Sequence, residues 1–353
     1  MAIRNRFQYE VATGRMTLPV AILIALLVWG STCREWTELV SMALCAAGTY
    51  LLIELNTTFA LIHTRTTLPS ALFLTLYAFC PFLHAYTPAV WLPVLFLGIL
   101  FALFQSYEAF YASTPVYHAF LLLGLGSLAI PPMLYLIPLI YIAMGDLRSF
   151  SARTFFAGLV GIATPYLFLL SYHLYLGNLE SACDTLLSSF RPMPIDYSIL
   201  SLEQAVSGSI VLLIILICSV RSLMATYQEK VQTRIMLRTL LILEAGILLL
   251  LLLQPHLFNA LFPLLIALGA LPCGHLFAQT YNRFTRIFFG TALLLILMLG
   301  LFNLWMHLFS FCPSGVIGEC FSPLSSPVPF CLSVPKPSCW PASVWDLIRF
   351  CPH

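Results

Sequence analysis

The chain has 353 residues, of which 60% are hydrophobic and only 8% are charged. Soluble domains carry roughly 25% charged residues, so this chain lacks the charged surface that a soluble protein of its size needs. Its net charge of +2 gives no indication of nucleic-acid binding. Apolar runs recur along the whole chain without the alternation of a β-barrel, so the composition predicts a helical membrane protein that contacts the lipid bilayer.

Eleven apolar segments approach the length of a membrane helix, which needs about 20 residues to cross a ~30 Å hydrocarbon core. The expected spans are 17–33, 39–55, 68–84, 89–105, 115–130, 131–144, 154–175, 206–223, 239–253, 256–278 and 287–311. The sequence therefore predicts an all-α polytopic bundle of about 11 helices in a single transmembrane domain, residues 1–311.

The first segment, 17–33, follows a basic stretch, as the apolar core of a signal peptide does. A lipoprotein cleavage site at Cys33 would need an aliphatic residue three positions earlier, where Gly30 stands. Because many spans follow, we expect this segment to remain as the first membrane helix.

Pro131 and Pro132 divide one apolar stretch, and the direction of all later spans depends on whether the chain turns there. A turn places twelve Lys and Arg residues in cytoplasmic segments and four outside, whereas one kinked span, 115–144, places seven inside and nine outside. Positive residues favour the cytoplasmic side, so we predict a short hairpin, a cytoplasmic N-terminus and an external C-terminus. Its two halves are only about 21 to 24 Å long, which leaves two short spans and a re-entrant hairpin as alternatives.

This orientation places the loop 176–205 on the outer face and the basic loop 224–238 on the inner face. Within the outer loop, 178–190 has an apolar helical stripe, for which a helix on the membrane surface and one packed on the bundle are alternatives. Residues 312–353 hold eight prolines and five of the eleven cysteines. This tail has no periodicity, so we expect poor order, with disulfides or a shifted reading frame as open explanations.

Glu244, in "TLLILEAGILLLLLL", is the clearest candidate functional residue. An acid at the centre of a membrane helix costs on the order of 2.5 to 3.5 kcal/mol to insert. It is therefore a candidate proton or cation relay, and the alternative is a neutral, hydrogen-bonded carboxyl that fixes helix packing.

Other polar candidates lie near the predicted membrane surfaces. Glu54 and Asn56 end the second span, and a Glu54–Arg65 contact is the structural alternative to a substrate role. Arg148 and Arg153 could hold a lipid phosphate or only anchor the topology. The candidate acids of the outer loop are Glu180, Asp184, Asp196 and Glu203.

The histidines stand singly, and no pair has the i, i+4 spacing of a helical metal site, so we predict neither a metal nor a cofactor. The small residues Gly124, Gly158 and Gly161 indicate close helix approach rather than a phosphate-binding loop.

Residues from roughly 60 to 175 carry three patterns: "HTRTTLPSALF", "FLLLGLGSLAIPPMLYLIPLIYIAM" and "RTFFAGLVGIATPYLFLL". Together they resemble an uncharacterised family of multi-pass bacterial inner-membrane proteins. They are similar, more weakly, to the membrane half of glycosyltransferases that use polyprenyl-phosphate sugars. That second resemblance implies an outer-face transferase, but those enzymes carry their catalytic acid in a long first outer loop. Here that loop is only 34–38, so the acids of 176–205 would have to replace it.

Three functions follow, all in the bacterial inner (cytoplasmic) membrane. The favoured one is a non-catalytic envelope-biogenesis component, or a subunit of an assembly with other membrane proteins as partners. The second is an enzyme that transfers a polyprenyl-linked sugar at the outer face. The third is a proton-coupled transporter that uses Glu244. We expect no nucleic-acid partner for any of them.

Overall fold

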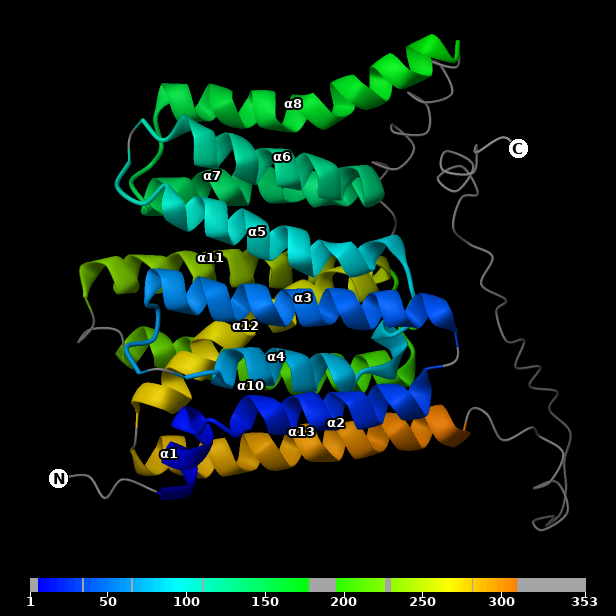
Figure 1. The fold of residues 1–353 in the computed structure, drawn as a ribbon, viewed down its shortest axis with the longest axis vertical. Helices are drawn as coiled ribbons and strands as arrows, with labels where there is room; N and C mark the ends of the chain where they lie inside the picture. The colour runs from blue at the N-terminus through cyan, green and yellow to red at the C-terminus, as the bar shows by residue number, and fades with distance from the viewer. Residues whose placement is uncertain are drawn as a thin grey trace, which may run out of the picture.

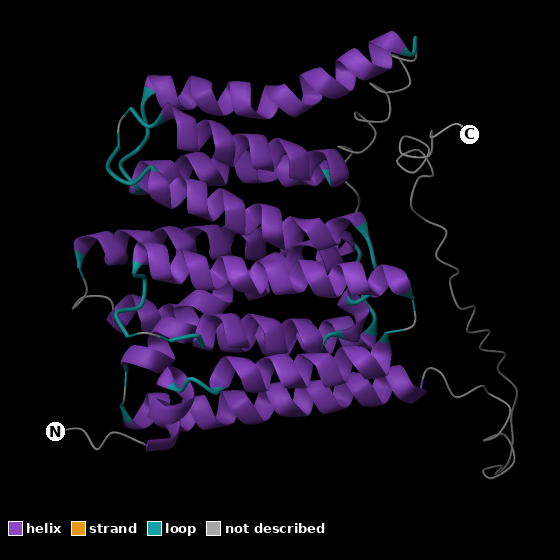
Figure 2. Ribbon diagram, viewed as in Figure 1, coloured by secondary structure: helices purple, strands orange, loops and turns teal. Residues whose placement is uncertain are grey.

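The computed structural model describes residues 6–33, 35–64, 66–109, 111–177, 195–225, 230–280 and 282–309. Within these residues the chain is all-α, with twelve α-helices joined by short loops and 3₁₀ turns (Figure 2). The α-helices are α1 (Arg6–Thr13), α2 (Thr17–Thr32), α3 (Trp36–Phe59), α4 (Leu68–Ala78), α5 (Leu92–Gln105), α6 (Ser113–Ala129), α7 (Ile137–Asp146), α8 (Ala152–Tyr175), α10 (Leu202–Ala225), α11 (Val231–Leu253), α12 (Phe258–Gln279) and α13 (Arg283–Phe309). The 3₁₀ turns are η1 (Pro81–Leu83), η2 (Pro88–Trp91), η3 (Pro131–Leu136), η4 (Tyr197–Ile199) and η6 (Pro255–Leu257).

The helices lie side by side and are stacked along the longest axis of the molecule, and the connections gather at the two ends of the helices (Figure 1). The start of α1 and the end of α13 lie at opposite ends. All ten Lys and Arg residues within the described ranges lie at or near one end, which also holds the α3–α4, α5–α6, α7–α8 and α12–α13 connections. We call it the basic end.

A helix lies in each of the eleven segments that the sequence predicts to be spans. Among the described residues, seven helices are long and apolar enough to cross a membrane, or eight if α1 and α2, bent by 78°, form one span. Three apolar helices are shorter, namely α4, α6 and the η3–α7 unit. A multi-pass helical membrane protein is thus confirmed, whereas eleven full crossings remain a prediction.

One predicted boundary is wrong. The third segment is predicted to continue to residue 84, but α4 ends at Ala78 because Pro81 begins a separate 3₁₀ turn. The basic loop 224–238 is predicted to be helical, and it mostly is, since α10 continues to Ala225 and α11 begins at Val231. The sequence Ser201–Gln204 predicts a capping box before the eighth span, and α10 begins at Leu202, a few residues before the predicted end of the loop 176–205.

The chain turns at Pro131, as predicted. Ile130 is extended, with φ −137° and ψ 92°, because a following proline disfavours the helical region. The turn brings the far end of α7 back to the start of α6, where the Glu108 N–H donates to the Leu147 carbonyl at 3.1 Å. The double proline therefore marks a hairpin and not a kink within one helix.

Glycines bring α6 and α8 into close contact, which confirms their predicted packing role. A Cβ added at Gly161 would lie 2.7 Å from the Tyr117 carbonyl oxygen, and one added at Gly158 would lie 2.8 Å from the Phe120 ring. On α6, Gly124 faces Pro165 of α8 in the same way.

The centre of the bundle is α12, in which residues 260–278 are all buried. It packs against α1, α4, α5, α10 and α11, and its apolar side chains cover all sides of the helix, as expected of a fully enclosed helix. Pro263 and Pro272 interrupt its hydrogen-bond pattern.

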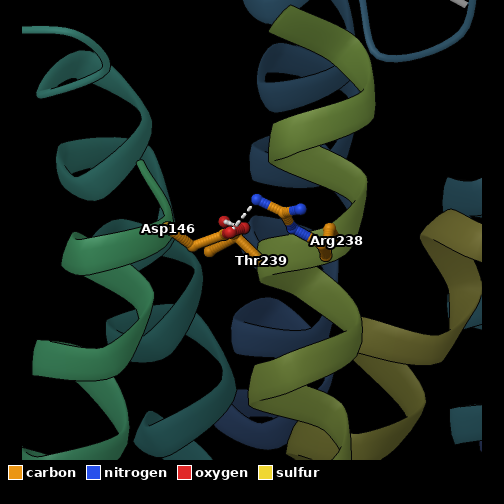
Figure 3. A network of polar contacts seen from close by, with 3 residues as sticks. All are labelled: Asp146, Arg238 and Thr239. Atoms are coloured by element: carbon orange, nitrogen blue, oxygen red, sulfur yellow. Dashed lines mark hydrogen bonds and ion pairs between the residues drawn. The ribbon is translucent and has the colours of Figure 1, made fainter. Parts of the chain in front are cut away.

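A polar contact joins α7 to α11 near the basic end. Arg238 donates to one carboxylate oxygen of Asp146, and Thr239 donates to the other at 3.1 Å (Figure 3). Further along the same interface, Leu139 fits against Gly246. These contacts link the α6–α8 part of the bundle to the part around α12.

Candidate functional site

Glu244 lies deep within α11, thirteen residues from Val231 (244 − 231), or about 20 Å along the helix axis. Its side chain is only 7% exposed. Ser219 of α10 donates to Glu244 Oε1 at 2.6 Å, whereas Oε2 is buried without a hydrogen-bond partner. An unsatisfied buried polar atom costs about 1 to 3 kcal/mol, so this carboxyl is a candidate for reversible proton binding.

Polar side chains lead from Glu244 toward the basic end. Ser222 lies one turn from Ser219 on the same face of α10, and its Oγ lies 3.4 Å from Nδ1 of His275 on α12. Ser222 and His275 are fully buried. His275 interacts electrostatically with His63, which is exposed in the loop after α3. We call these five residues the polar file.

Two cysteines lie beside Glu244. Cys273 of α12 contacts Cys218 of α10 and interacts electrostatically with Glu244. Both thiols are buried and free. One turn away, α12 approaches α10 so closely that a Cβ at Gly269 would lie 2.5 Å from Cδ1 of Ile215. The carboxyl is therefore enclosed by three helices.

Asn56 has a structural role in the loop after α3. Its Oδ1 accepts from the Ile62 N–H at 3.2 Å, and its Nδ2 donates to the Thr66 carbonyl at 3.4 Å. The side chain is 7% exposed. These bonds hold the loop that carries His63, so Asn56 positions the end of the polar file.

Glu54, one turn before the end of α3, is exposed and accepts a hydrogen bond from Thr58 Oγ1 at 3.2 Å. Arg65 lies outside the described residues, so the predicted Glu54–Arg65 contact stays a prediction. Glu54 is not part of the polar file.

Arg148 and Arg153 have different surroundings. Arg148 pairs with Glu108 at 3.7 Å, and both side chains are more than half exposed. Arg153 lines a shallow pocket of about 430 Å³ with Thr114 and Tyr117 at the basic end, and Arg148 is not among the lining residues. An arginine beside hydroxyl groups can bind phosphate, so the surroundings of Arg153 suit the predicted lipid-phosphate role, which stays a prediction for both arginines.

Of the four predicted outer-loop acids, Glu180 and Asp184 lie outside the described residues. Asp196 accepts from the Ser198 N–H at 2.9 Å, and hydrogen bonds to Ser198 hold the pKa of the Asp196 carboxyl below its usual value. Glu203 lies in the first turn of α10, after a capping box in which Ser201 and Gln204 exchange hydrogen bonds. Nothing described joins these two acids in one site.

The sequence did not predict a polar cluster at the opposite end of the bundle. Asn303 of α13 donates to Ser207 Oγ at 2.9 Å and to the Phe79 carbonyl at 2.8 Å, and both polar side chains are fully buried. His84 stacks on Trp29, with ring centroids 4.0 Å apart. In the sequence these residues are only single histidines and an asparagine near the ends of predicted spans. They have no common spacing, so the sequence alone does not indicate that they lie together.

The sequence also did not predict an apolar groove of about 380 Å³. Side chains from α1, α2, α4, α10, α12 and α13 line it, including Ile215 and Gly269. Its lining is mostly apolar, with Glu10, Thr17 and Thr75 as its polar side chains.

Comparison with known proteins assigns no family to the chain, because no family model, curated protein or solved structure matches it. The two resemblances noted for residues 60 to 175 therefore gain no support. Among the described residues, no three His, Cys, Asp or Glu side chains are grouped to hold a metal ion.

Proposed function

We propose that this chain is a proton-coupled transporter of a bacterial inner membrane and that Glu244 is its coupling group. The observation that carries the proposal is the buried Glu244 carboxyl, whose Oε2 has no partner, at the end of a polar file that begins at exposed His63. Ionisable groups inside membrane spans are costly and are typical of proton and ion pathways.

The position of α12 supports this proposal over the non-catalytic role that the sequence alone favours. Transporter sites are typically built beside interrupted helices at the centre of a bundle. α12 is continuous, but Pro263 and Pro272 each remove a backbone donor from it; its residues 260–278 are buried, and it contributes His275 to the polar file.

The proposed orientation places the basic end in the cytoplasm. Every Lys and Arg within the described ranges lies at or near that end, and such residues favour the cytoplasmic side. The polar file then reaches Glu244 from the cytoplasm, while the end of α13 lies outside.

Proton binding by Glu244 can be measured without knowing the cargo. A pH step applied to proteoliposomes should give a transient current as protons bind, and Glu244→Gln should abolish it because the amide cannot take up a proton. Glu54→Gln is the matched control, since Glu54 is an exposed acid on α3. A full transient in Glu244→Gln, with both variants folded, would refute the proposal.

A second candidate function, a subunit of a membrane assembly that supports envelope biogenesis, is favoured by α8. This helix is the least buried of the seven candidate spans, at 22%. Phe156, Phe168 and Tyr172 are among its exposed side chains. A photo-crosslinker at Phe168 should capture one defined protein if α8 binds a partner, and only lipid if it does not.

A third candidate, transfer of a polyprenyl-linked sugar, rests on the outer-loop acids. Asp196 and Glu203 gain no common site from the structure, and Glu180 and Asp184 lie outside its described residues. Amide substitution of each acid tests this candidate, because the enzyme requires at least one of them.

A further inference from the structure

Two polar pairs face each other on α10 and α13 at the end opposite the basic end. Glu203 and Ser207 are four residues apart on α10, and Asn303 and His307 are four apart on α13, so each pair shares one helix face. Ser207 and Asn303 are hydrogen-bonded and fully buried. Glu203 and His307 interact electrostatically nearer the surface.

His84 extends this group into the bundle. It interacts electrostatically with His307, and its Nδ1 lies 2.9 Å from Thr32 Oγ1. The His84 ring is 2% exposed and lies against the backbone of Tyr77 and Ala78, with which it interacts by hydrogen bonding. A ring nitrogen that faces a backbone carbonyl can bind a proton and donate it there. We call Glu203, Ser207, Asn303, His307 and His84 the outer cluster.

Apolar side chains separate the outer cluster from the polar file. Ser207 and Ser219 are twelve residues apart on α10 (219 − 207), or about 18 Å along the axis. Between them Val211, Ile214 and Ile215 are buried and face the core. Gly269 lies so close to Ile215 that not even a Cβ would fit without a shift. The same three side chains line the apolar groove, so the side chains that separate the two polar regions on this face of α10 are apolar.

We propose that the outer cluster is a second proton-binding site, centred on His84, and that Val211, Ile214 and Ile215 form an apolar plug that separates it from Glu244. Protonation forms an N–H bond at His84 Nε2 or an O–H bond at Glu244 Oε2, and water at either end of the bundle supplies or takes the proton. This inference rests on the proposed function, because a plug matters only if Glu244 exchanges protons.

The other titratable groups around these sites are buried thiols and a phenol. Tyr77 stacks on Trp29 beside His84, and Cys80 contacts Ser207. Cys218 and Cys273 flank Glu244. None of these four side chains is exposed. Water therefore reaches the polar file at the exposed His63, and it reaches the outer cluster at the Glu203–His307 pair.

Shortening the plug tests the separation. Ile215→Ser removes the side chain that fills the space against Gly269 and adds a hydroxyl, so proteoliposomes containing it should lose a pH gradient several-fold faster than wild type. Leu216→Ser is the matched control, because Leu216 is exposed on the same helix. A gradient as stable in Ile215→Ser as in wild type would overturn the plug.

The role of His84 in the second proton-binding site is tested in the Ile215→Ser variant, which is expected to leak protons. His84→Phe keeps a ring stacked on Trp29 but removes both nitrogens, so it should slow the Ile215→Ser leak several-fold. An unchanged leak would overturn the role of His84. If Ile215→Ser does not fold, Ile215→Thr replaces it, because threonine keeps a branched side chain and still adds a hydroxyl; a pH gradient as stable as in wild type would again overturn the plug.

Failure of the plug proposal is distinguishable from failure of the proposed function. If Glu244→Gln abolishes the transient current but Ile215→Ser does not leak protons, only the plug is refuted. If Ile215→Ser leaks protons but Glu244→Gln keeps the full transient current, only the coupling role of Glu244 is refuted.

Discussion

The backbone N–H of Glu108 donates to the carbonyl of Leu147 at 3.1 Å, although the two residues are separated by α6, the double proline and α7. This bond joins the loop before α6 to the loop after α7. The chain therefore leaves and returns to the same end of the bundle within 40 residues (147 − 108 = 39).

Topology reporters should show this return. Ser149 precedes α8, and Ser198 follows it at the other end of the bundle. A reporter fused after Ser149 should read cytoplasmic, and one fused after Ser198 should read external. The same side for both would contradict the α8 crossing, and reversed sides would contradict the proposed orientation while leaving the fold intact.

Loss of the Asp146 charge should weaken the α7–α11 interface. Asp146→Asn removes the ion pair with Arg238, whose side chain is 56% exposed, but can keep the hydrogen bond from Thr239. We expect a loss of about 1 kcal/mol in the free energy of unfolding, measured by thermal unfolding in detergent. Glu108→Gln is the control, because its pair with Arg148 is exposed on both sides and should change stability little. Equal effects in the two variants would contradict the assigned role of Asp146.

A methyl group at Gly161 should force α6 and α8 apart. Gly161→Ala places a Cβ 2.7 Å from the Tyr117 carbonyl oxygen, and overpacking of this kind costs about 1 to 3 kcal/mol. Gly290→Ala on α13 meets nothing within 4 Å and should be neutral or slightly stabilising, since alanine is the better helix former. Thermal unfolding of the two variants checks the sign of each effect, and a neutral Gly161→Ala would contradict the close approach.

Removal of the Asn56 side chain should loosen the loop before α4. Asn56→Ala leaves the Ile62 N–H without its acceptor, at a cost of about 1 to 3 kcal/mol. Asn56→Asp keeps the acceptor oxygen and should retain more stability than Asn56→Ala. Hydrogen exchange at Ile62 reads the loss directly, and unchanged protection in Asn56→Ala would contradict the assigned bond.

Local sequence signals predicted much of the fold. The length of the apolar runs located a helix in every expected segment, and the distribution of Lys and Arg residues predicted the hairpin at Pro131. The glycine contacts between α6 and α8 followed from the rule that small residues allow close approach. The early end of α4 was missed because its apolar run continues through Phe79 and Phe82, so hydropathy alone gave no stop.

The candidate site was only partly predictable. Glu244 was found because a single acid in an apolar run is conspicuous. The other residues of the polar file were not predicted, since Ser219 lies 25 residues from Glu244 in the sequence and His275 is on α12. Such contacts depend on which helix faces are apposed, and chain spacing does not encode this.

The enclosure of α12 has a consequence for the order of synthesis. Ten of the other described helices are made before it, yet α1, α4, α5, α10 and α11 pack against it in the finished protein. The faces of these helices that contact α12 therefore have no partner until residues 258–279 have been translated. A ribosome stalled before that point would release a bundle whose central helix is missing.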